Sequence, residues 1–152
     1  MGKRKEAKIL IVYHTQNGNT KKLADAVRKG ASSVKGTKVV LKRAAKATLG
    51  DLLYCDGIAF GTPDYFSYMA GMLKDFFDRT CYPSEGKVTG KPYVAFVSHG
   101  GGGKAVESVE RLCHRFKLKK IAPPLLAEGV PTKMVLGGAY ELGKKLAEKV
   151  KR

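Results

Sequence analysis

Residues 8–20 read KILIVYHTQNGNT, and this stretch decides the fold. Its first half, from Ile9 to Tyr13, is an unbroken apolar run, which is typical of a strand covered on both faces of a sheet. Its second half is polar, contains Gly18, and leads into a helical pattern of apolar residues that starts at Leu23. A buried strand that turns directly into a helix is the first unit of a βαβ fold.

The same alternation continues along the rest of the chain. Further short apolar runs occupy residues 37–41, 57–60, 93–97 and roughly 121–127. Apolar residues at helical spacing lie between and after them, in residues 23–34, 69–77, 106–116 and 142–150, and a shorter helix is expected at 48–54. This order predicts right-handed βαβ units around a parallel sheet.

The polarity of the strands predicts their places in the sheet. The apolar first strand suits the centre, whereas the second, which contains Lys38 and Lys42, suits an edge. We therefore expect an α/β fold: a doubly wound five-stranded parallel sheet of order 2-1-3-4-5 with helices on both faces. The length of 152 residues fits one domain over the whole chain, residues 1–152.

Positive charge dominates the composition. The chain has 29 Lys and Arg against 13 Asp and Glu, a formal net charge of +16. Residues 1–50 hold 13 basic and 2 acidic residues, and residues 100–152 hold 12 and 5, whereas residues 51–99 hold 4 and 6. Such an excess favours a partner that is anionic, such as nucleic acid or an acidic protein.

Several classes of protein are excluded by composition. No apolar run approaches the ~20 residues of a membrane span, so no contact with a membrane is expected. The cysteines Cys55, Cys81 and Cys113 are odd in number and form no C-x-x-C pair. This pattern argues against a disulfide framework or a metal site and favours a reducing, cytoplasmic location.

Three loops define the expected site, because ligands of doubly wound sheets bind beyond the carboxyl ends of the strands. The first loop offers hydroxyl and amide side chains and the unpaired N–H groups of a helix start: Thr15, Gln16, Asn17, Gly18, Asn19 and Thr20. These are the groups that hold a phosphate. The alternative is an ordinary turn, with Asn19 or Thr20 as the helix N-cap.

The other two loops are aromatic and glycine-rich. The second contains Thr62, Pro63, Asp64, Tyr65, Phe66, Ser67 and Tyr68, whose aromatic rings could stack on a planar ligand or fold back onto the core. The third contains Ser98, His99, Gly100, Gly101 and Gly102, which could bring backbone amides against a ligand or form a flexible surface loop. His99 is either a ligand contact or a hydrogen-bonded loop residue.

Other functions of this architecture lack their essential residues. Gly103-Lys104 is followed by Ala105, where a P-loop needs Ser or Thr. A receiver domain needs an Asp at the end of its third strand, where this chain has Gly61-Thr62. A low-molecular-weight tyrosine phosphatase needs an Arg six residues after its Cys, and none of the three cysteines has one.

The loop sequences resemble those of the flavodoxin-like superfamily. TQNGNT at 15–20 resembles the flavodoxin pattern Ser/Thr-x-Thr-Gly-x-Thr, which holds the FMN phosphate. GTPDYFSYMAG at 61–71 is similar to the G-T-P-x-x-F-x-x-M-[SA]-G signature of the WrbA-like and NADPH-dependent FMN reductase-like members. The resemblance covers nearly the whole chain in strand and helix order. It implies an FMN-binding redox protein, either an electron carrier or a small NAD(P)H-dependent flavin or quinone reductase.

The resemblance also implies roles for the loop residues. Residues 15–20 would hold the phosphate, residues 62–66 would lie along the isoalloxazine and ribityl chain, and residues 98–102 would contact the pyrimidine side of the ring. Tyr68 or Tyr82 would cover its exposed face. No residue is assigned a catalytic role, and NADH and NADPH both remain open as reductants.

The chain departs from the WrbA-like pattern in three places. The insertions that build the tetramer of WrbA-like quinone reductases are missing at 40–55 and 131–137. The flavin-contacting His of that family is replaced near Lys117. Oligomeric state is therefore left open.

The positive charge allows two interpretations. For a redox protein, a basic rim would steer an acidic redox partner, such as a ferredoxin or rubredoxin, or a nicotinamide nucleotide. The alternative is a basic nucleic-acid- or protein-binding module on the same scaffold without redox chemistry, although no RRM, KH or helix-turn-helix pattern is visible.

Overall fold

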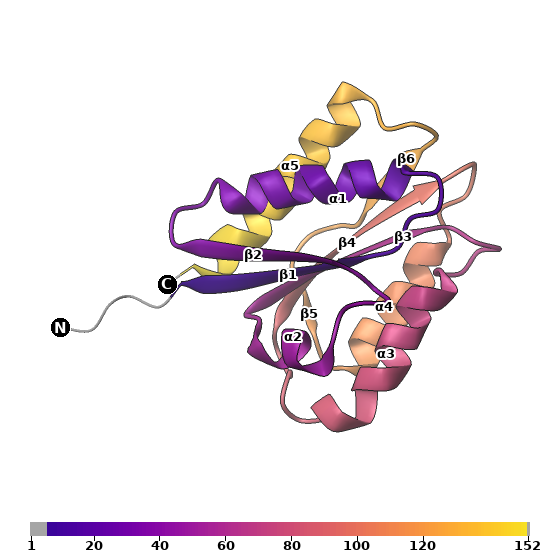
Figure 1. The fold of residues 1–152 in the computed structure, drawn as a ribbon. Coiled ribbons are helices and arrows are strands. Elements are labelled where there is room, and N and C mark those ends of the chain that lie inside the picture. Colours follow the sequence, from indigo (N-terminus) through magenta and orange to yellow (C-terminus); the bar gives the residue numbers. More distant parts are fainter. Residues whose placement is uncertain (1–5, 152) are drawn as a thin grey trace.

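Strands and helices alternate along the chain, as the apolar pattern predicted. The protein is represented by a computed structural model, which describes residues 6–151 (Figure 1). The elements are β1 Ala7–Tyr13, α1 Asn19–Ser32, β2 Thr37–Arg43, α2 Leu49–Tyr54, β3 Gly57–Pro63, α3 Gly71–Ser84, β4 Pro92–His99, α4 Ala105–Arg115, β5 Lys119–Lys120, β6 Leu125–Glu128 and α5 Lys133–Val150.

The sheet has the predicted doubly wound topology. Its strands follow the order β2-β1-β3-β4-β5 and all their pairings are parallel, which confirms the expected order 2-1-3-4-5. β1 pairs with β2 over its whole length, from Ala7 opposite Thr37 to Tyr13 opposite Arg43. The carboxyl ends of β1, β3 and β4 therefore lie side by side at one edge of the sheet.

The fifth strand differs from the prediction. A single strand was expected at about 121–127, but two short strands are present, and the sheet has six. β5 pairs with the start of β4, and β6 pairs with its end. Pro123 and Pro124 lie between them, and proline has no N–H to donate to a neighbouring strand. These prolines account for the interruption.

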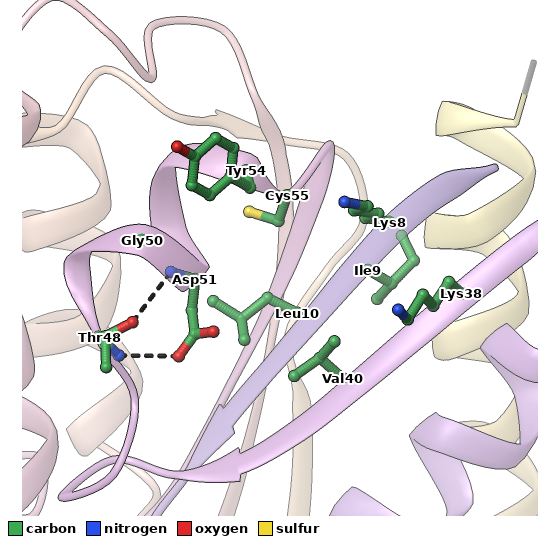
Figure 2. A pocket seen from close by; sticks show the side chains of 10 residues that line it. All are labelled: Lys8, Ile9, Leu10, Lys38, Val40, Thr48, Gly50, Asp51, Tyr54 and Cys55. Carbon is green, nitrogen blue, oxygen red and sulfur yellow. Dashed lines mark hydrogen bonds between the residues drawn. The ribbon is translucent and has the colours of Figure 1, made fainter. Parts of the chain in front are cut away.

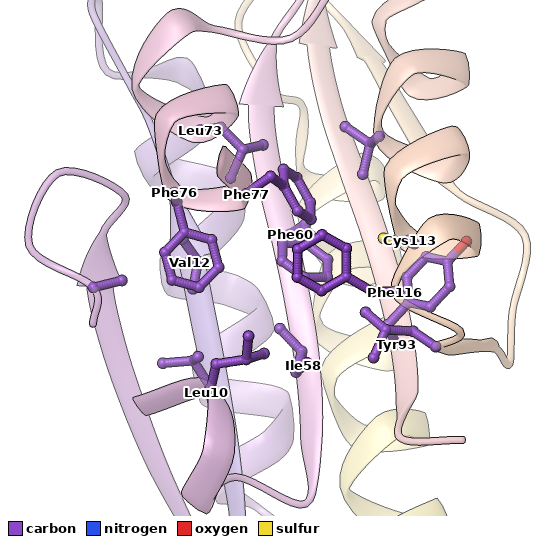
Figure 3. Packing of buried hydrophobic residues seen from close by; sticks show 14 of the residues in the cluster. Leu10, Val12, Ile58, Phe60, Leu73, Phe76, Phe77, Tyr93, Cys113 and Phe116 are labelled. Atoms are coloured by element: carbon purple, nitrogen blue, oxygen red, sulfur yellow. The ribbon is translucent and has the colours of Figure 1, made fainter. Parts of the chain in front are cut away.

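Side chains alternate between two apolar layers, one on each face of the sheet. Ile9 and Ile11 of β1 belong to the layer beneath α1 and α5, whereas Leu10 and Val12 belong to the layer beneath α2, α3 and α4. Figure 3 shows the second layer, whose rings include Phe60. Both faces of β1 are thus buried, as its apolar sequence predicted.

Two glycines allow α1 and α5 to touch backbone to backbone. A Cβ atom at Gly30 would overlap the carbonyl oxygen of Tyr140, and one at Gly143 would overlap the carbonyl oxygen of Val27. Gly137 lies on the same helix as Gly143, but a Cβ there would meet nothing within 4 Å. The contact between the two helices therefore depends on two particular glycines and not on the glycine content of α5.

No helix within residues 6–151 has both the length and the apolar character needed to cross a membrane.

The substitution Gly143→Ala should destabilise the protein by about 3 kcal/mol, because its methyl group can be accommodated only if α1 and α5 separate. Gly137→Ala is the matched control on the same helix, and it should leave stability unchanged or raise it by up to about 1 kcal/mol through better helix propensity. Urea unfolding followed by circular dichroism measures both free energies. Equal effects of the two substitutions would contradict the backbone contact.

Candidate functional site

The three predicted loops surround one cleft at the carboxyl edge of the sheet. Its volume is about 360 Å³, within the range of small-molecule sites. Its lining comes from all three loops and from the turn after β6: Gln16, Asn17, Asn19, Pro63, Asp64, Tyr65, Ser98, His99, Gly100 and Gly129. Gly129 was not predicted from the sequence, because its position depends on the extra strand β6.

The first loop is shaped by its own side chains. Thr15 Oγ1 accepts a hydrogen bond from the N–H of Gly18 at 3.0 Å, and Asn17 Oδ1 accepts one from the N–H of Asn19 at 3.1 Å. The N-cap of α1 is Gly18, in the left-handed region with φ 98°, and no side chain caps the helix. The expected alternative of a turn capped by Asn19 or Thr20 is therefore wrong.

The first turn of α1 keeps unused donors. No hydrogen bond among the described residues engages the N–H of Thr20 or of Lys21. Lys21 forms an ion pair with Asp25, Nζ to Oδ2, at 2.8 Å, whereas Lys22 has no ion-pair partner in the described chain. Since the start of a helix also carries a partial positive charge, this turn attracts an anion.

The side chain of Thr20 points into the protein. It is fully buried, and its Oγ1 lies 2.7 Å from Oγ of Ser98, the equally enclosed residue near the end of β4. This hydrogen bond ties the first loop to the third. Thr20 can therefore offer a ligand its backbone N–H, while its hydroxyl serves the protein.

Asp64 and Thr62 also turn inward, and they fix the second loop. Asp64 Oδ1 accepts from the N–H of Ser67 at 2.8 Å, and its Oδ2 accepts from the N–H of Ala105, at the start of α4, at 3.0 Å. Thr62 Oγ1 donates to the carbonyl of Pro63 at 2.7 Å and accepts from the N–H of Ala70 at 2.9 Å. The carboxylate of Asp64 thus joins the turn at residues 65–68, the aromatic turn, to the end of the third loop, the glycine loop.

The aromatic turn projects one ring fully into solvent. Tyr65 and Tyr68 exchange backbone hydrogen bonds of 2.9 and 3.0 Å, and Phe66 and Ser67 between them have φ values of 56° and 63°. This is the φ pattern of a type I′ turn, which normally uses Asn or Gly. Phe66 has 102% relative exposure, so it does not fold back onto the core.

The two tyrosines that were expected to cover the exposed face of the ligand ring differ in position. Tyr68 lies at the end of the aromatic turn and is 42% exposed. Tyr82 is near the end of α3, about three helical turns from the loop that precedes this helix. Tyr68 therefore remains near the cleft, whereas the structure does not bring Tyr82 to it.

His99 organises the glycine loop. Its Nδ1 accepts hydrogen bonds from the N–H groups of Gly101 and Gly102, each at 3.0 Å, so the proton of the neutral ring lies on Nε2. A Cβ atom at Gly100 or Gly102 would meet nothing within 4 Å. The loop is therefore ordered by His99 and leaves open space beside its backbone.

Arg43 lies beside the first loop, and the sequence did not predict it there. It ends β2 opposite Tyr13, and its Nη1 donates to the carbonyl oxygen of Thr15 at 3.5 Å. Its guanidinium lies 5.8 Å from the centre of the Tyr13 ring. The edge-strand assignment contained the necessary signal, since the register of two parallel strands brings the last residue of β2 beside the first loop.

Tyr65, which lines the cleft, and His14, which packs against it outside the lining, form a neutral aromatic wall. Burial, together with the nearby Arg43, lowers the pKa of His14, and burial raises the pKa of Tyr65. Both rings are therefore neutral at pH 7, and they meet edge to face with centroids 6.2 Å apart. A neutral aromatic wall suits a planar ligand.

The cysteines lie outside the lining of the cleft. Cys55 and Cys113 are buried, and burial raises the pKa of both thiols, that of Cys55 to about 12. Within residues 6–151, no cluster of three or more His, Cys, Asp or Glu side chains could hold a metal ion. The chemistry that these loops can perform unaided is binding and orientation.

Comparison with known proteins gives a family. The model of the family described as NADPH-dependent FMN reductase matches residues 39–124. A flavodoxin of Aquifex aeolicus is 43% identical over 96 residues, which are 63% of this chain and 52% of that protein. An NAD(P)H dehydrogenase (quinone) of Acidithiobacillus ferrooxidans is 35% identical over 120 residues, covering 62% of this chain and 60% of that protein. The chain thus spans little more than half the length of these relatives.

A solved structure supports the same assignment over the full chain. A flavodoxin from the domain Archaea superposes with a TM-score of 0.87 and 30% identity, covering 95% of this chain and 99% of that one. The predicted resemblance to flavodoxin-like proteins is confirmed, and the nucleic-acid alternative receives no support from these similarities. The chain belongs to the NADPH-dependent FMN reductase family of flavodoxin-like proteins.

Proposed function

We propose that the loop cleft binds FMN and that the protein transfers electrons through it, as an electron carrier or as a small reductase supplied by NADH or NADPH. One observation carries the proposal: a single cleft combines an unsatisfied anion-binding helix start with a neutral aromatic wall. FMN has both matching parts, a phosphate dianion and a planar ring system.

The first loop is the proposed phosphate site. The N–H groups of Thr20 and Lys21 have no hydrogen-bond acceptor. Two cations are close to them: Lys22 is next in the sequence, and Arg43 pairs with Tyr13, just before the loop. A dianion here would accept hydrogen bonds from the unpaired N–H groups at the start of α1. Its negative charge would also offset the unfavourable placement of lysines in the first turn of this helix. The side chains of Gln16, Asn17 and Asn19 line the cleft and can donate further hydrogen bonds.

The second and third loops form the proposed ring site. Tyr65 lines the cleft and Phe66 stands at its aromatic turn, while the backbone around Gly100 has room for a ligand. Thr62 and Asp64 act by positioning these loops, because their polar atoms are engaged within the protein. His99 keeps the glycine loop in place through Nδ1 and can donate to a ligand through Nε2.

When bound, FMN supplies one- and two-electron transfer, which no side chain of the cleft can provide. The described residues bind the group, orient it and limit the access of water. The neutral state of His14 and Tyr65 keeps unpaired charge away from the ring. We assign no residue of this chain as an acid, base or nucleophile.

The visible spectrum of the protein is the direct test of the proposal. Protein purified from cells, or protein titrated with FMN, should show a flavin absorbance whose fine structure differs from that of free FMN. A protein without a flavin spectrum that also fails to bind added FMN would contradict both the carrier and the reductase.

The substitution Lys22→Gln should weaken FMN binding by about three- to tenfold, because it removes a cation from the phosphate end. Its effect on riboflavin, which lacks the phosphate, should be small. Lys29→Gln near the end of the same helix is the matched control and should change neither affinity. Fluorescence titration with each flavin gives the dissociation constants, and an equal loss for both flavins would rule out a phosphate site at this helix.

The substitution Asp64→Asn should weaken FMN binding by about tenfold or more, since an amide cannot accept both charge-assisted hydrogen bonds. Hydrogen exchange should become faster at Ser67 and Ala105, because one of these two donors loses its acceptor and the other keeps only a neutral amide oxygen. Asp75→Asn removes an exposed carboxylate that pairs with Arg79 and serves as the control. Unchanged exchange at the two donors would show that Asp64 does not hold the loops.

Rapid mixing with NADH and with NADPH distinguishes the two versions of the function. A reductase should lose its flavin absorbance quickly with at least one nucleotide, whereas a carrier should react with neither and accept electrons from a chemical reductant. The ratio of the two rates gives the preferred nucleotide. The first outcome identifies a nicotinamide nucleotide as the electron donor, and the second excludes both nucleotides as direct donors.

We further propose that an acidic redox protein is the partner of the cleft. Lys21, Lys22 and Arg43 lie at the first loop, and Lys104 precedes α4 at the third. These cations would attract a negative surface toward the ring. Electron transfer should slow as ionic strength rises, and a rate independent of salt would contradict electrostatic steering.

A further inference from the structure

A second cavity lies at the opposite end of the sheet. Its volume is about 360 Å³, and it is enclosed by the first halves of β1 and β2 and by α2 (Figure 2). Its principal side chains are Lys8, Leu10, Lys38, Val40, Asp51 and Tyr54. Since β1 and β2 run parallel and their carboxyl ends lead to the loop cleft, this cavity is separate from the proposed FMN site.

The helix α2, which borders the cavity, is short and is hydrogen-bonded at both ends. The helix begins with a capping box, in which Thr48 Oγ1 accepts the N–H of Asp51 at 3.1 Å and Asp51 Oδ2 accepts the N–H of Thr48 at 2.9 Å. Its far end is fixed by Lys91, whose Nζ donates to the carbonyls of Leu52 and Leu53 at 3.0 and 2.8 Å. Both ends of α2 are therefore hydrogen-bonded, and the cavity lies between this helix and the two strands.

The floor of the cavity is apolar. Leu10 is buried, and Val40, two residues beyond Lys38 on the same face of β2, is only partly covered. The ring of Tyr54 stands at the edge with 76% exposure (Figure 2). Uncovered apolar surface beside an exposed aromatic ring favours an apolar occupant.

Two exposed lysines stand at the mouth of the cavity. Lys8 and Lys38 are direct partners in the parallel register, where like charges repel. No carboxylate among residues 6–151 lies within ion-pair distance of either ammonium group, whereas Lys42, farther along the same face, pairs with Asp51 at 2.9 Å. Asp56 accepts the backbone N–H of Lys8, at 2.8 Å. An anion between the two lysines would relieve their repulsion.

We propose that this cavity binds a small organic acid with an apolar body, such as an aryl or alkyl carboxylate. The body lies on Leu10 and Val40 beside the ring of Tyr54, and the carboxylate lies between Lys8 and Lys38. The site binds and does not react, because the only thiol lining it, that of Cys55, is buried and donates to the carbonyl of Leu52 at 3.2 Å. The proposal is independent of FMN binding.

The test is an NMR titration of the isotope-labelled protein with 4-phenylbutyrate, carried out with and without excess FMN. Backbone shifts should change at Lys8, Val40, Asp51 and Tyr54, and FMN should not abolish them. Butyrate, which has the charge without the ring, and 4-phenylbutanol, which has the ring without the charge, should each bind at least several-fold more weakly. Shifts confined to the loop cleft, or removed by FMN, would overturn the proposal.

Two double variants test whether Lys8 and Lys38 supply the binding energy for the carboxylate. The double substitution Lys8→Gln with Lys38→Gln should weaken 4-phenylbutyrate by about tenfold, as expected for two exposed ion pairs. Lys29→Gln with Lys145→Gln removes the same charge from α1 and α5, on the other face of the sheet, and should have no effect. An equal loss in both double variants would indicate non-specific attraction to a basic protein and would overturn the site. Thermal unfolding of each variant confirms that the fold is retained.

Discussion

The site depends on the carboxylate of Asp64, whose two oxygens both accept hydrogen bonds from backbone N–H groups. One oxygen holds the turn at Ser67 and the other holds the start of α4 at Ala105, so one side chain sets the distance between the aromatic and glycine loops. The buried hydrogen bond between Thr20 and Ser98 makes the corresponding link from the first loop to the third. Charge-assisted bonds to backbone N–H groups are stronger than neutral ones. The cleft is therefore preorganised by polar side chains that join its loops to one another.

Apolar periodicity predicted most of the fold. The run from Ile9 to Tyr13 is buried on both faces and occupies the interior of the sheet, and the polar second strand is at its edge. The prediction of a single fifth strand was wrong, because apolar periodicity does not show which backbone groups can form hydrogen bonds. Residues 121–127 look apolar, yet Pro123 and Pro124 divide them, and only the register with β4 shows that the chain pairs on either side of these prolines. A strand is defined by its donors as well as by its side chains.

Residue types located the three loops but could not give the direction of each side chain. Thr20 was predicted as a ligand contact because it is a hydroxyl residue at a helix start, and Thr62 and Asp64 because of the resemblance to flavodoxin-like proteins. In the structure, the hydroxyl or carboxylate of each also bonds to a group of the protein itself. Arg43 was overlooked for the converse reason. Nothing in its immediate neighbourhood in the sequence marks a site, and it reaches Thr15 only through the pairing of β1 with β2. Such contacts follow from tertiary structure, which a linear pattern does not contain.

The turn at Phe66 and Ser67 shows how the protein balances local cost against function. Each of these residues has a left-handed backbone, a conformation that costs of order 1–3 kcal/mol for residues other than glycine. Asn-Gly would form the same turn at lower cost, but it would remove the ring that stands in solvent. The bond from Ser67 to Asp64, of about 1.5–3 kcal/mol, offsets part of the strain. Strain and an exposed ring would both be unfavourable in a turn that served only to connect β3 with α3. Their coincidence beside a neutral aromatic wall is accounted for if the ring of Phe66 meets a planar ligand.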